Sequence, residues 1–180
     1  MVDGPSAGDP RGELPMDPDV DDASSVRRAS HAYLRPSVLA LVFVGGVFGT
    51  LARYSVEEAV PHRSPDWPIG TFAVNVLGAF LLGLLLEILM RRGADVGVRK
   101  RARLLLGTGF CGAFTTYSTF ALEAVLLTRD GHATTALAYG VATVVLGAAA
   151  AWLGIVAGAS AHRKASMHRK ASMHRKTEAQ

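Results

Sequence analysis

Four long apolar segments dominate the pattern of hydrophobic and polar positions along this chain. They cover residues 37–54, 69–90, 104–127 and 136–159. Each is about as long as the roughly 17–25 residues that a helix needs to cross a bilayer, and no strand-like alternation competes with this interpretation. Three polar or proline-containing joints separate them, at residues 61–68, 91–103 and 128–135. The pattern predicts an all-α membrane protein, a bundle of four transmembrane helices.

The two ends of the chain are polar and carry opposite charges. Up to Val26 there are seven acidic residues against Arg11 alone, whereas the last nineteen residues hold six Lys and Arg against one acid. Such ends cannot bury a core. We therefore expect a disordered N-terminal tail at residues 1–35, acidic and then basic, a four-span domain at residues 36–160, and a disordered basic tail at residues 161–180.

The C-terminal tail repeats the motif HRKASM, which starts at His162 and again at His168, and its first three letters recur at His174. We interpret it as a solvated basic tail that touches anionic headgroups. Metal binding by the three histidines and modification of Ser166 or Ser172 are alternatives.

Basic residues next to the spans indicate the orientation in the membrane. One side collects Arg27, Arg28, Arg35, Arg91, Arg92, Arg99, Lys100, Arg101, Arg103 and the C-terminal tail. The other side has only Arg53, Arg63 and Arg129. The positive-inside rule then places both termini in the cytoplasm. No apolar stretch follows the first residues, so we expect insertion to rely on the internal spans and not on a signal peptide.

The composition gives no indication of catalytic or metal-binding chemistry. Hydrophobic residues make up 49% of the chain, and the single cysteine, Cys111, cannot form an intrachain disulfide. The spans hold no Ser–His pair and no cluster of metal-ligating side chains. We expect neither an enzyme nor a nucleic-acid partner, but a protein whose surroundings are the lipid bilayer.

Polar side chains within the spans are the candidates for function, because lipid cannot pair them. Asn75 shares a helical face with Gly78, Ala79 and Leu82, so another helix can approach closely beside its amide. Asn75 is therefore either a hydrogen-bonding contact between helices or a donor to a passing solute.

The first and fourth spans carry weaker signals. Gly45, Gly49 and Arg53 follow one another at four-residue spacing, which predicts a glycine packing surface. Arg53 either extends to the interface or lines an entrance that attracts anions. Tyr139 and Thr143, four residues apart, either extend a polar track or satisfy each other or a neighbour.

The third span contains two features that hydrocarbon would not tolerate alone. Gly109 and Gly112 weaken the helix, and the Thr115–Thr116 pair can bond to carbonyls in place of the helical ladder. We expect a local break there. Its freed carbonyl oxygens must be enclosed by protein, and they suit a small cation such as Na⁺.

Beyond this break, Tyr117 and Phe120 fall on one face, where their positively charged ring edges could flank an anion. Three hydroxyl donors lie within one turn: Thr116, Ser118 and Thr119. Glu123 follows one turn later. The alternative is a packed, kinked helix with its aromatic rings in the core.

Three motifs follow one another on successive spans: GGVFGTLARY at 45–54, GTFAVNVLGAFLLG at 70–83 and GFCGAFTTYSTFALE at 109–123. Together they resemble the signatures of the fluoride channel family, Fluc or CrcB, over residues 36–159. The resemblance implies a channel that passively exports F⁻ from the cytoplasm and so lowers its toxicity. It also implies an antiparallel dimer with two pores along its interface and a structural Na⁺ on its twofold axis.

The resemblance assigns roles to residues of this chain. Backbone carbonyls hold the Na⁺ in the family, at positions that match Gly112 and Thr115. Asn75 matches the pore asparagine, while Tyr117 and Phe120 match two pore phenylalanines. The expected fluoride pathway comprises Arg53, Asn75, Thr116, Tyr117, Ser118, Thr119, Phe120, Glu123, Tyr139 and Thr143.

Two departures from the family pattern stand out. The first aromatic is Tyr117 instead of phenylalanine, so its hydroxyl needs a partner. In the fourth span, Gly147 stands where a further hydroxyl is expected after Thr143.

An antiparallel homodimer also requires one sequence to insert both ways, but the basic residues here are strongly biased. We therefore expect this chain to work beside a related subunit of opposite bias, with a dimer of itself as the alternative.

Two other function classes are alternatives to a channel. A small proton-coupled multidrug transporter of four spans would need a carboxylate deep in the first span, and residues 37–54 contain none. A membrane scaffold would use the polar residues only as contacts between helices.

Overall fold

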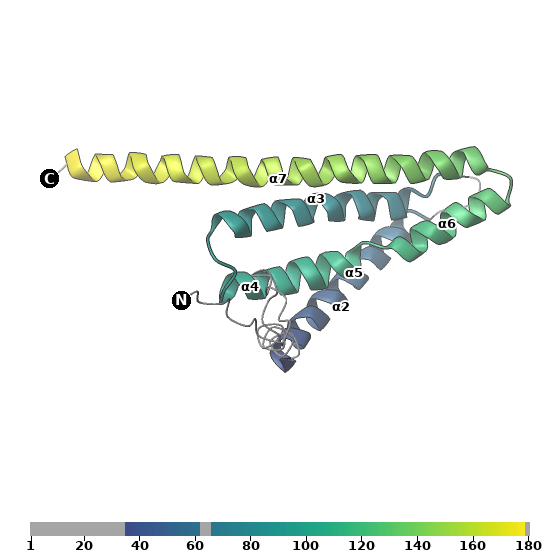
Figure 1. Cartoon of the computed structure of the whole chain (residues 1–180), viewed down its shortest axis with the longest axis horizontal. Helices are drawn as coiled ribbons and strands as arrows, with labels where there is room; N and C mark the ends of the chain where they lie inside the picture. The colour runs from purple at the N-terminus through teal and green to yellow at the C-terminus, as the bar shows by residue number, and fades with distance from the viewer. Residues whose placement is uncertain (1–34, 62–65, 179–180) are drawn as a thin grey trace, which may run out of the picture. The chain divides into compact units, whose positions relative to one another are not determined.

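The computed structural model describes residues 35–61 and 66–178, with side chains described up to residue 161. Every element of this part is helical (Figure 1): α2 (Pro36–Ala59), α3 (Ile69–Arg91), α4 (Val98–Ala102), the π-helical segment η1 (Arg103–Cys111), α5 (Gly112–Phe114), α6 (Tyr117–Arg129) and α7 (Ala133–Glu178). Four stretches are long and apolar enough to cross a membrane: Pro36–Ala59, Ile69–Arg91, Val98–Arg129 and Ala133–Ala161. The predicted all-α architecture with four spans is confirmed.

Glycines bring α2 against the first half of the third span. A side chain at Gly45 would collide with the backbone of η1, and a Cβ at Gly49 would lie 3.0 Å from the carbonyl carbon of Phe110. From the other side, a Cβ at Gly109 would lie 2.7 Å from the carbonyl oxygen of Val42. The predicted packing surface of the first span is therefore confirmed.

The second and fourth spans form the most extensive helix pair, and α3 runs alongside α7 in Figure 1. Glycines again allow the approach: a Cβ at Gly154 would lie 2.8 Å from the backbone nitrogen of Leu84. The sequence did not single out this pair, because a glycine does not reveal which helix its face meets.

The third span is broken where the sequence predicted. Thr115 has φ −81° and ψ 156°, and Thr116 has φ −144° and ψ 122°, so both residues are extended between α5 and α6. The π-helical turn of η1 before the break was not predicted. Wider π turns are frequent next to functional sites.

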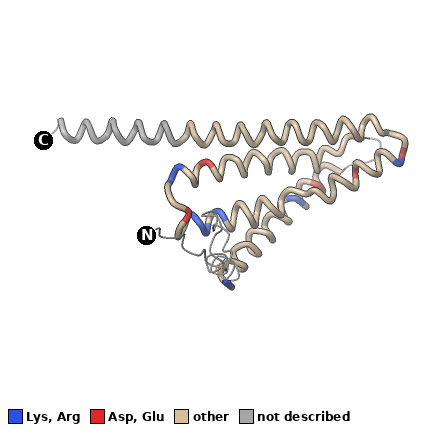
Figure 2. The backbone as a smooth tube through the Cα atoms, in the orientation of Figure 1, with Lys and Arg blue, Asp and Glu red and all other residues tan. Residues whose placement is uncertain are grey.

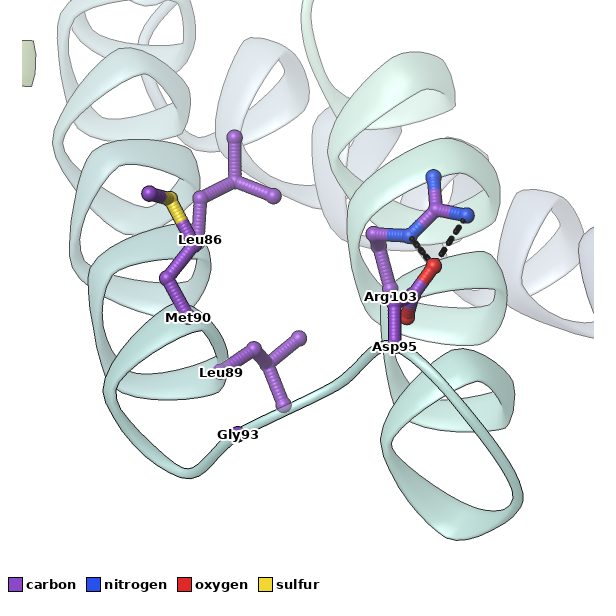
Figure 3. Close-up of a pocket in the computed structure, with 6 residues that line it drawn as sticks. All are labelled: Leu86, Leu89, Met90, Gly93, Asp95 and Arg103. Atoms are coloured by element: carbon purple, nitrogen blue, oxygen red, sulfur yellow. Dashed lines mark hydrogen bonds and ion pairs between the residues drawn. The ribbon is translucent and has the colours of Figure 1, made fainter.

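Charged residues of the described part gather near the ends of the long helices (Figure 2). In the joint between α3 and α4, the guanidinium of Arg103 donates to Asp95 at 2.9 Å (Figure 3), and Arg99 donates to the carbonyl oxygens of Arg92 and Ala94. The Arg103–Asp95 pair lies at a cavity of about 310 Å³ whose other walls come mainly from the C-terminal end of α3. The joint is thus fixed by its own arginines.

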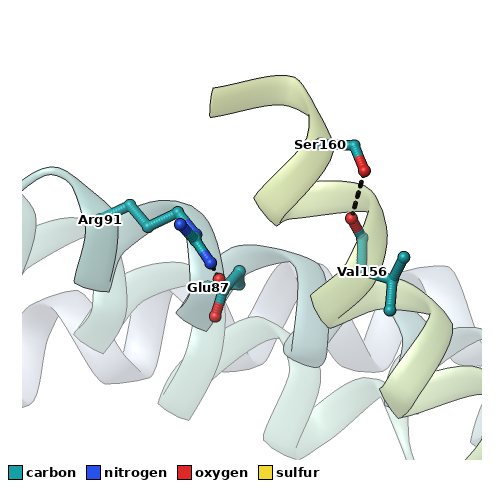
Figure 4. Close-up of polar contacts among 4 residues, drawn as sticks. All are labelled: Glu87, Arg91, Val156 and Ser160. Carbon is teal, nitrogen blue, oxygen red and sulfur yellow. Dashed lines mark hydrogen bonds and ion pairs between the residues drawn. The ribbon is translucent and has the colours of Figure 1, made fainter. Parts of the chain in front are cut away.

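Charge is also paired at the end of the second span. Arg91 forms an ion pair with Glu87, one turn earlier on α3 (Figure 4). On the neighbouring α7, the Ser160 hydroxyl donates to the carbonyl oxygen of Val156 at 2.9 Å. These contacts satisfy polar groups where the spans end. The cytoplasmic orientation of this end stays a prediction.

The helix of the fourth span continues beyond its predicted end. Helix α7 runs to Glu178 and so includes the basic repeat, where the sequence predicts a disordered tail. The physical reason is that residues after Gly158 include no glycine or proline, while Ala, Lys, Arg and Met favour helix. The predicted N-terminal tail lies outside the described residues, apart from Arg35.

Candidate functional site

The break in the third span is held by the side chain of Asn75 on α3. Its Nδ2 donates to the carbonyl oxygen of Thr116 at 3.0 Å, and the backbone N–H of Thr116 donates to its Oδ1 at 2.8 Å. An amide side chain therefore pairs with the extended backbone as a neighbouring strand would. The two alternatives left open for Asn75 are compatible, because one of its two amide N–H groups is not needed for this contact.

These bonds leave two carbonyls without their helical donors. In a continuous helix, the N–H of Thr116 would donate to Gly112 and the N–H of Thr119 to Thr115. Instead, Thr116 donates to Asn75, and Thr119 donates to the Thr116 hydroxyl at 3.1 Å. The carbonyls of Gly112 and Thr115, the two predicted as cation ligands, are therefore among those released at the break.

A cluster of hydroxyls begins α6. Thr116 Oγ1 lies 3.0 Å from Thr119 Oγ1 and 3.3 Å from Ser118 Oγ. Thr116 is buried, whereas Ser118 is exposed. The three hydroxyls, which were predicted to lie within one turn, form one connected network.

A cavity of about 310 Å³, here called the hydroxyl cavity, lies beside this network. It is lined by Asn75, Thr115, Thr116, Tyr117, Phe120, Thr143 and Val144. The ring centroids of Tyr117 and Phe120 are 6.2 Å apart, at an angle of 45°. Helices α3, α6 and α7 thus bring five of the predicted pathway side chains to one cavity.

Glu123 is held from two sides. Its Oε1 accepts a hydrogen bond from the Thr71 hydroxyl at 2.7 Å, and its Oε2 accepts one from the Tyr139 hydroxyl at 2.8 Å. Tyr139 is fully buried, and the ring of Trp67 meets it edge-on at 5.6 Å. The carboxylate orientation is therefore fixed by α3 and α7 together.

A second, smaller cavity of about 140 Å³, here called the glutamate cavity, adjoins Glu123. Its lining residues are Glu57, Val60, Gly70, Thr71, Thr119 and Glu123. Three residues around Glu123 were not predicted from the sequence: Thr71, Trp67 and Glu57. A signal existed for Thr71, because it lies four residues before Asn75 on the same helical face.

The remaining predicted residues are placed differently. Arg53 lies on α2 and lines neither cavity. The Thr143 hydroxyl donates to the carbonyl oxygen of Tyr139 at 2.7 Å, and Tyr139 itself turns to Glu123. The two hydroxyls therefore do not bond to each other, and each donates to a neighbouring group instead.

The fold and these cavities define a small four-span membrane protein, with hydroxyls, an amide and aromatic rings around a broken third span. The model of the CrcB-like protein family (Camphor Resistance, CrcB) matches residues 40–155. The chain belongs to this family, which confirms the resemblance read from its motifs.

Several fluoride-specific ion channels match this chain over most of their length. The fluoride-specific ion channel FluC 1 of Cutibacterium acnes is 45% identical over 123 residues, which cover 68% of this chain and 86% of that protein. FluC 2 of Leifsonia xyli, also a fluoride-specific ion channel, is 44% identical over 135 residues, covering 74% and 92%. FluC 2 of Moorella thermoacetica is 44% identical over 117 residues, covering 64% and 92%.

Proposed function

We propose that this protein is a fluoride-selective channel through which F⁻ leaves the cytoplasm down its gradient. The relatives described above carry the name of fluoride-specific ion channels, and they match nearly the whole four-span region. The observation that supports the proposal in this chain is the hydroxyl cavity, where donors for a small anion converge inside a membrane span.

Fluoride gives up water only where other donors replace it. The second amide N–H of Asn75, the hydroxyls near Thr116 and the ring edges of Tyr117 and Phe120 supply such donors at close quarters. Each donor is weaker than a fixed charge, so the ion can also leave. Passive movement of this kind needs no chemical step.

The released carbonyls of Gly112 and Thr115 would hold a structural Na⁺. Unwound carbonyl oxygens inside a membrane are suitable Na⁺ ligands. No side chain crowds this position, since a Cβ at Gly112 would meet nothing within 4 Å. The ion would supply positive charge that holds the break, and the ligands to complete its shell would come from a second subunit.

A dimer is also favoured by the pathway itself. Tyr117 lines the hydroxyl cavity, yet it is 81% exposed in the single subunit. One subunit therefore does not enclose the path for an ion, whereas an antiparallel partner would cover this ring and complete a pore. Two such pores would follow from twofold symmetry.

We further propose that the partner is a related chain with the opposite bias of basic residues. The Lys and Arg of this chain favour cytoplasmic termini, whereas an antiparallel homodimer needs both orientations in equal amounts. Topology tags at both termini should report mainly cytoplasmic ends. Equal populations of the two orientations would contradict a partner of opposite bias and favour a dimer of this chain with itself.

The function is tested by fluoride efflux from liposomes that contain this subunit alone or with its related partner. We expect fluoride to leave and chloride to stay, and the Phe120→Ile variant to slow the efflux. Efflux only with both chains would assign the channel to the heterodimer. No fluoride efflux from correctly folded protein in either preparation would contradict the function, and uptake of a cationic dye driven by a proton gradient would favour a multidrug transporter.

A further inference from the structure

Glu57, near the end of α2, has an unusual position for a carboxylate in a membrane span. It lines the glutamate cavity together with Glu123, and its Oε1 is buried without a hydrogen-bond partner. Buried polar atoms are nearly always paired, so an orphaned carboxylate oxygen calls for a physical reason.

The two carboxylates of this cavity differ in how they are held. Both oxygens of Glu123 accept hydrogen bonds, from Thr71 and Tyr139. Glu57 receives no comparable support from the hydroxyls of Thr71 and Thr119, although these share the cavity with it. Glu57 is therefore not part of the network that orients Glu123.

Structural packing gives only a partial account of Glu57. Its backbone lies against the first turn of α3, where a Cβ at Gly70 would lie 3.5 Å from the Glu57 Cα. Arg53 lies one turn earlier on α2, but the described residues form no ion pair between the two. Packing of the backbone explains the position of the residue and leaves its charge unexplained.

The charge faces the route that an anion would take. The hydroxyl of Thr119 connects the hydroxyl network to the glutamate cavity, because Thr119 bonds to Thr116 on one side and lines the cavity on the other. An ion that moved from Asn75 past these hydroxyls would reach Glu123 and Glu57 next. Two carboxylates there repel an anion more strongly than one does, since a half-buried site screens charge poorly.

We propose that Glu57 sets the rate of fluoride passage by placing a second negative charge at the glutamate cavity, beside Glu123. This role rests on the fluoride channel function proposed above. Exclusion of chloride stays with the hydroxyl cavity, because its rings and amide select by size and hydrogen bonding. Glu57 therefore limits speed without deciding which halide enters.

The test compares fluoride efflux from liposomes that hold Glu57→Gln, Glu57→Asp, Glu58→Gln or the unchanged chain, each with its partner if one is needed. Glu57→Gln removes the charge at nearly constant shape, so we expect efflux about threefold faster or more. Glu57→Asp keeps the charge and should stay near the original rate. Glu58 is exposed on the same helix, so Glu58→Gln is a matched control that should change nothing.

Three results would overturn the role of Glu57 while fluoride still flows: an unchanged or slower Glu57→Gln, an equal acceleration by Glu58→Gln, or a chloride leak in Glu57→Gln. Size-exclusion profiles identical to the unchanged chain show that the variants are folded. If the unchanged chain and its partner release no fluoride, the proposed channel function itself fails, and this role fails with it.

Discussion

The two halves of the third span are packed by opposite means. The first half, η1 and α5, meets α2 through bare glycine backbone, and a Cβ at Gly49 or Gly109 would collide there. The second half, α6, is also held by a carboxylate, Glu123, which accepts hydrogen bonds from hydroxyls on α3 and α7. The first half fixes where the span lies, and the second half carries the side chains that we propose for the fluoride path.

The largest effect should come from disturbing the glycine contact between α2 and the first half of the third span. In Gly49→Leu, the added side chain would lie against the Phe110 backbone, which cannot move aside, and the Cβ alone would already be 3.0 Å from its carbonyl carbon. We expect a loss of stability above about 3 kcal/mol, the upper range for overpacked sites. The measurement is the yield of monodisperse protein after detergent extraction.

A neighbouring glycine provides the control for this prediction. A Cβ at Gly46 would lie 3.9 Å from the Ala113 Cβ, an ordinary contact, so Gly46→Ala should leave the yield unchanged. Equal losses in the two variants would show that the helix surface, and not the close approach at Gly49, determines assembly.

The second largest effect should come from Asn75, which holds the break between the two halves of the third span. Asn75→Ala would leave the N–H and carbonyl of Thr116 unpaired, at a cost of about 1–3 kcal/mol for each buried group. We expect fluoride efflux to fall at least about tenfold, the equivalent of 1.4 kcal/mol in a barrier. Asn75→Asp keeps the acceptor for the Thr116 N–H and should retain more activity than Asn75→Ala. The reverse order would show that the amide acts only as a donor to the ion.

The same contrast explains how much could be predicted from the sequence. Spans, glycine surfaces and the break follow from local composition, and the structure confirms each of them. Local composition also marked Asn75, Thr116, Tyr117 and Phe120, which do line one cavity. Their shared role in fluoride passage remains a prediction.

What the sequence could not provide is the pairing between distant segments. Thr71 and Tyr139 are separated from Glu123 by 52 and 16 residues, and no local pattern reveals that both bond to it. Glu57 was missed because it follows the first apolar segment and resembles an ordinary residue of a joint. Only the approach of α2, α3 and α6 places it in the glutamate cavity.

A moderate effect is expected from loss of a hydrogen bond that holds Glu123 in α6. Tyr139→Phe removes one of the two hydrogen bonds to Glu123 and keeps the ring that packs on Trp67 and Phe120. A hydrogen bond to a charged group contributes about 1.5–3 kcal/mol, and because Glu123 keeps its second bond we expect only part of this in the barrier, so that efflux slows several-fold. Thr71→Val should act alike. The reduction in efflux rate of the double variant should be smaller than the product of the two single reductions, because both bonds hold one carboxylate. Strictly multiplicative losses would contradict a shared role.

The smallest effect should come from Tyr117, the departure from the expected phenylalanine. Its ring lines the hydroxyl cavity, but the side chain is 81% exposed, and its hydroxyl is not part of the network around Thr116. If only the ring edge meets the ion, Tyr117→Phe should leave fluoride efflux within about twofold, whereas Tyr117→Ile removes the edge and should slow it clearly. A large loss in Tyr117→Phe would instead mean that the hydroxyl is a working donor, and that a partner subunit positions it.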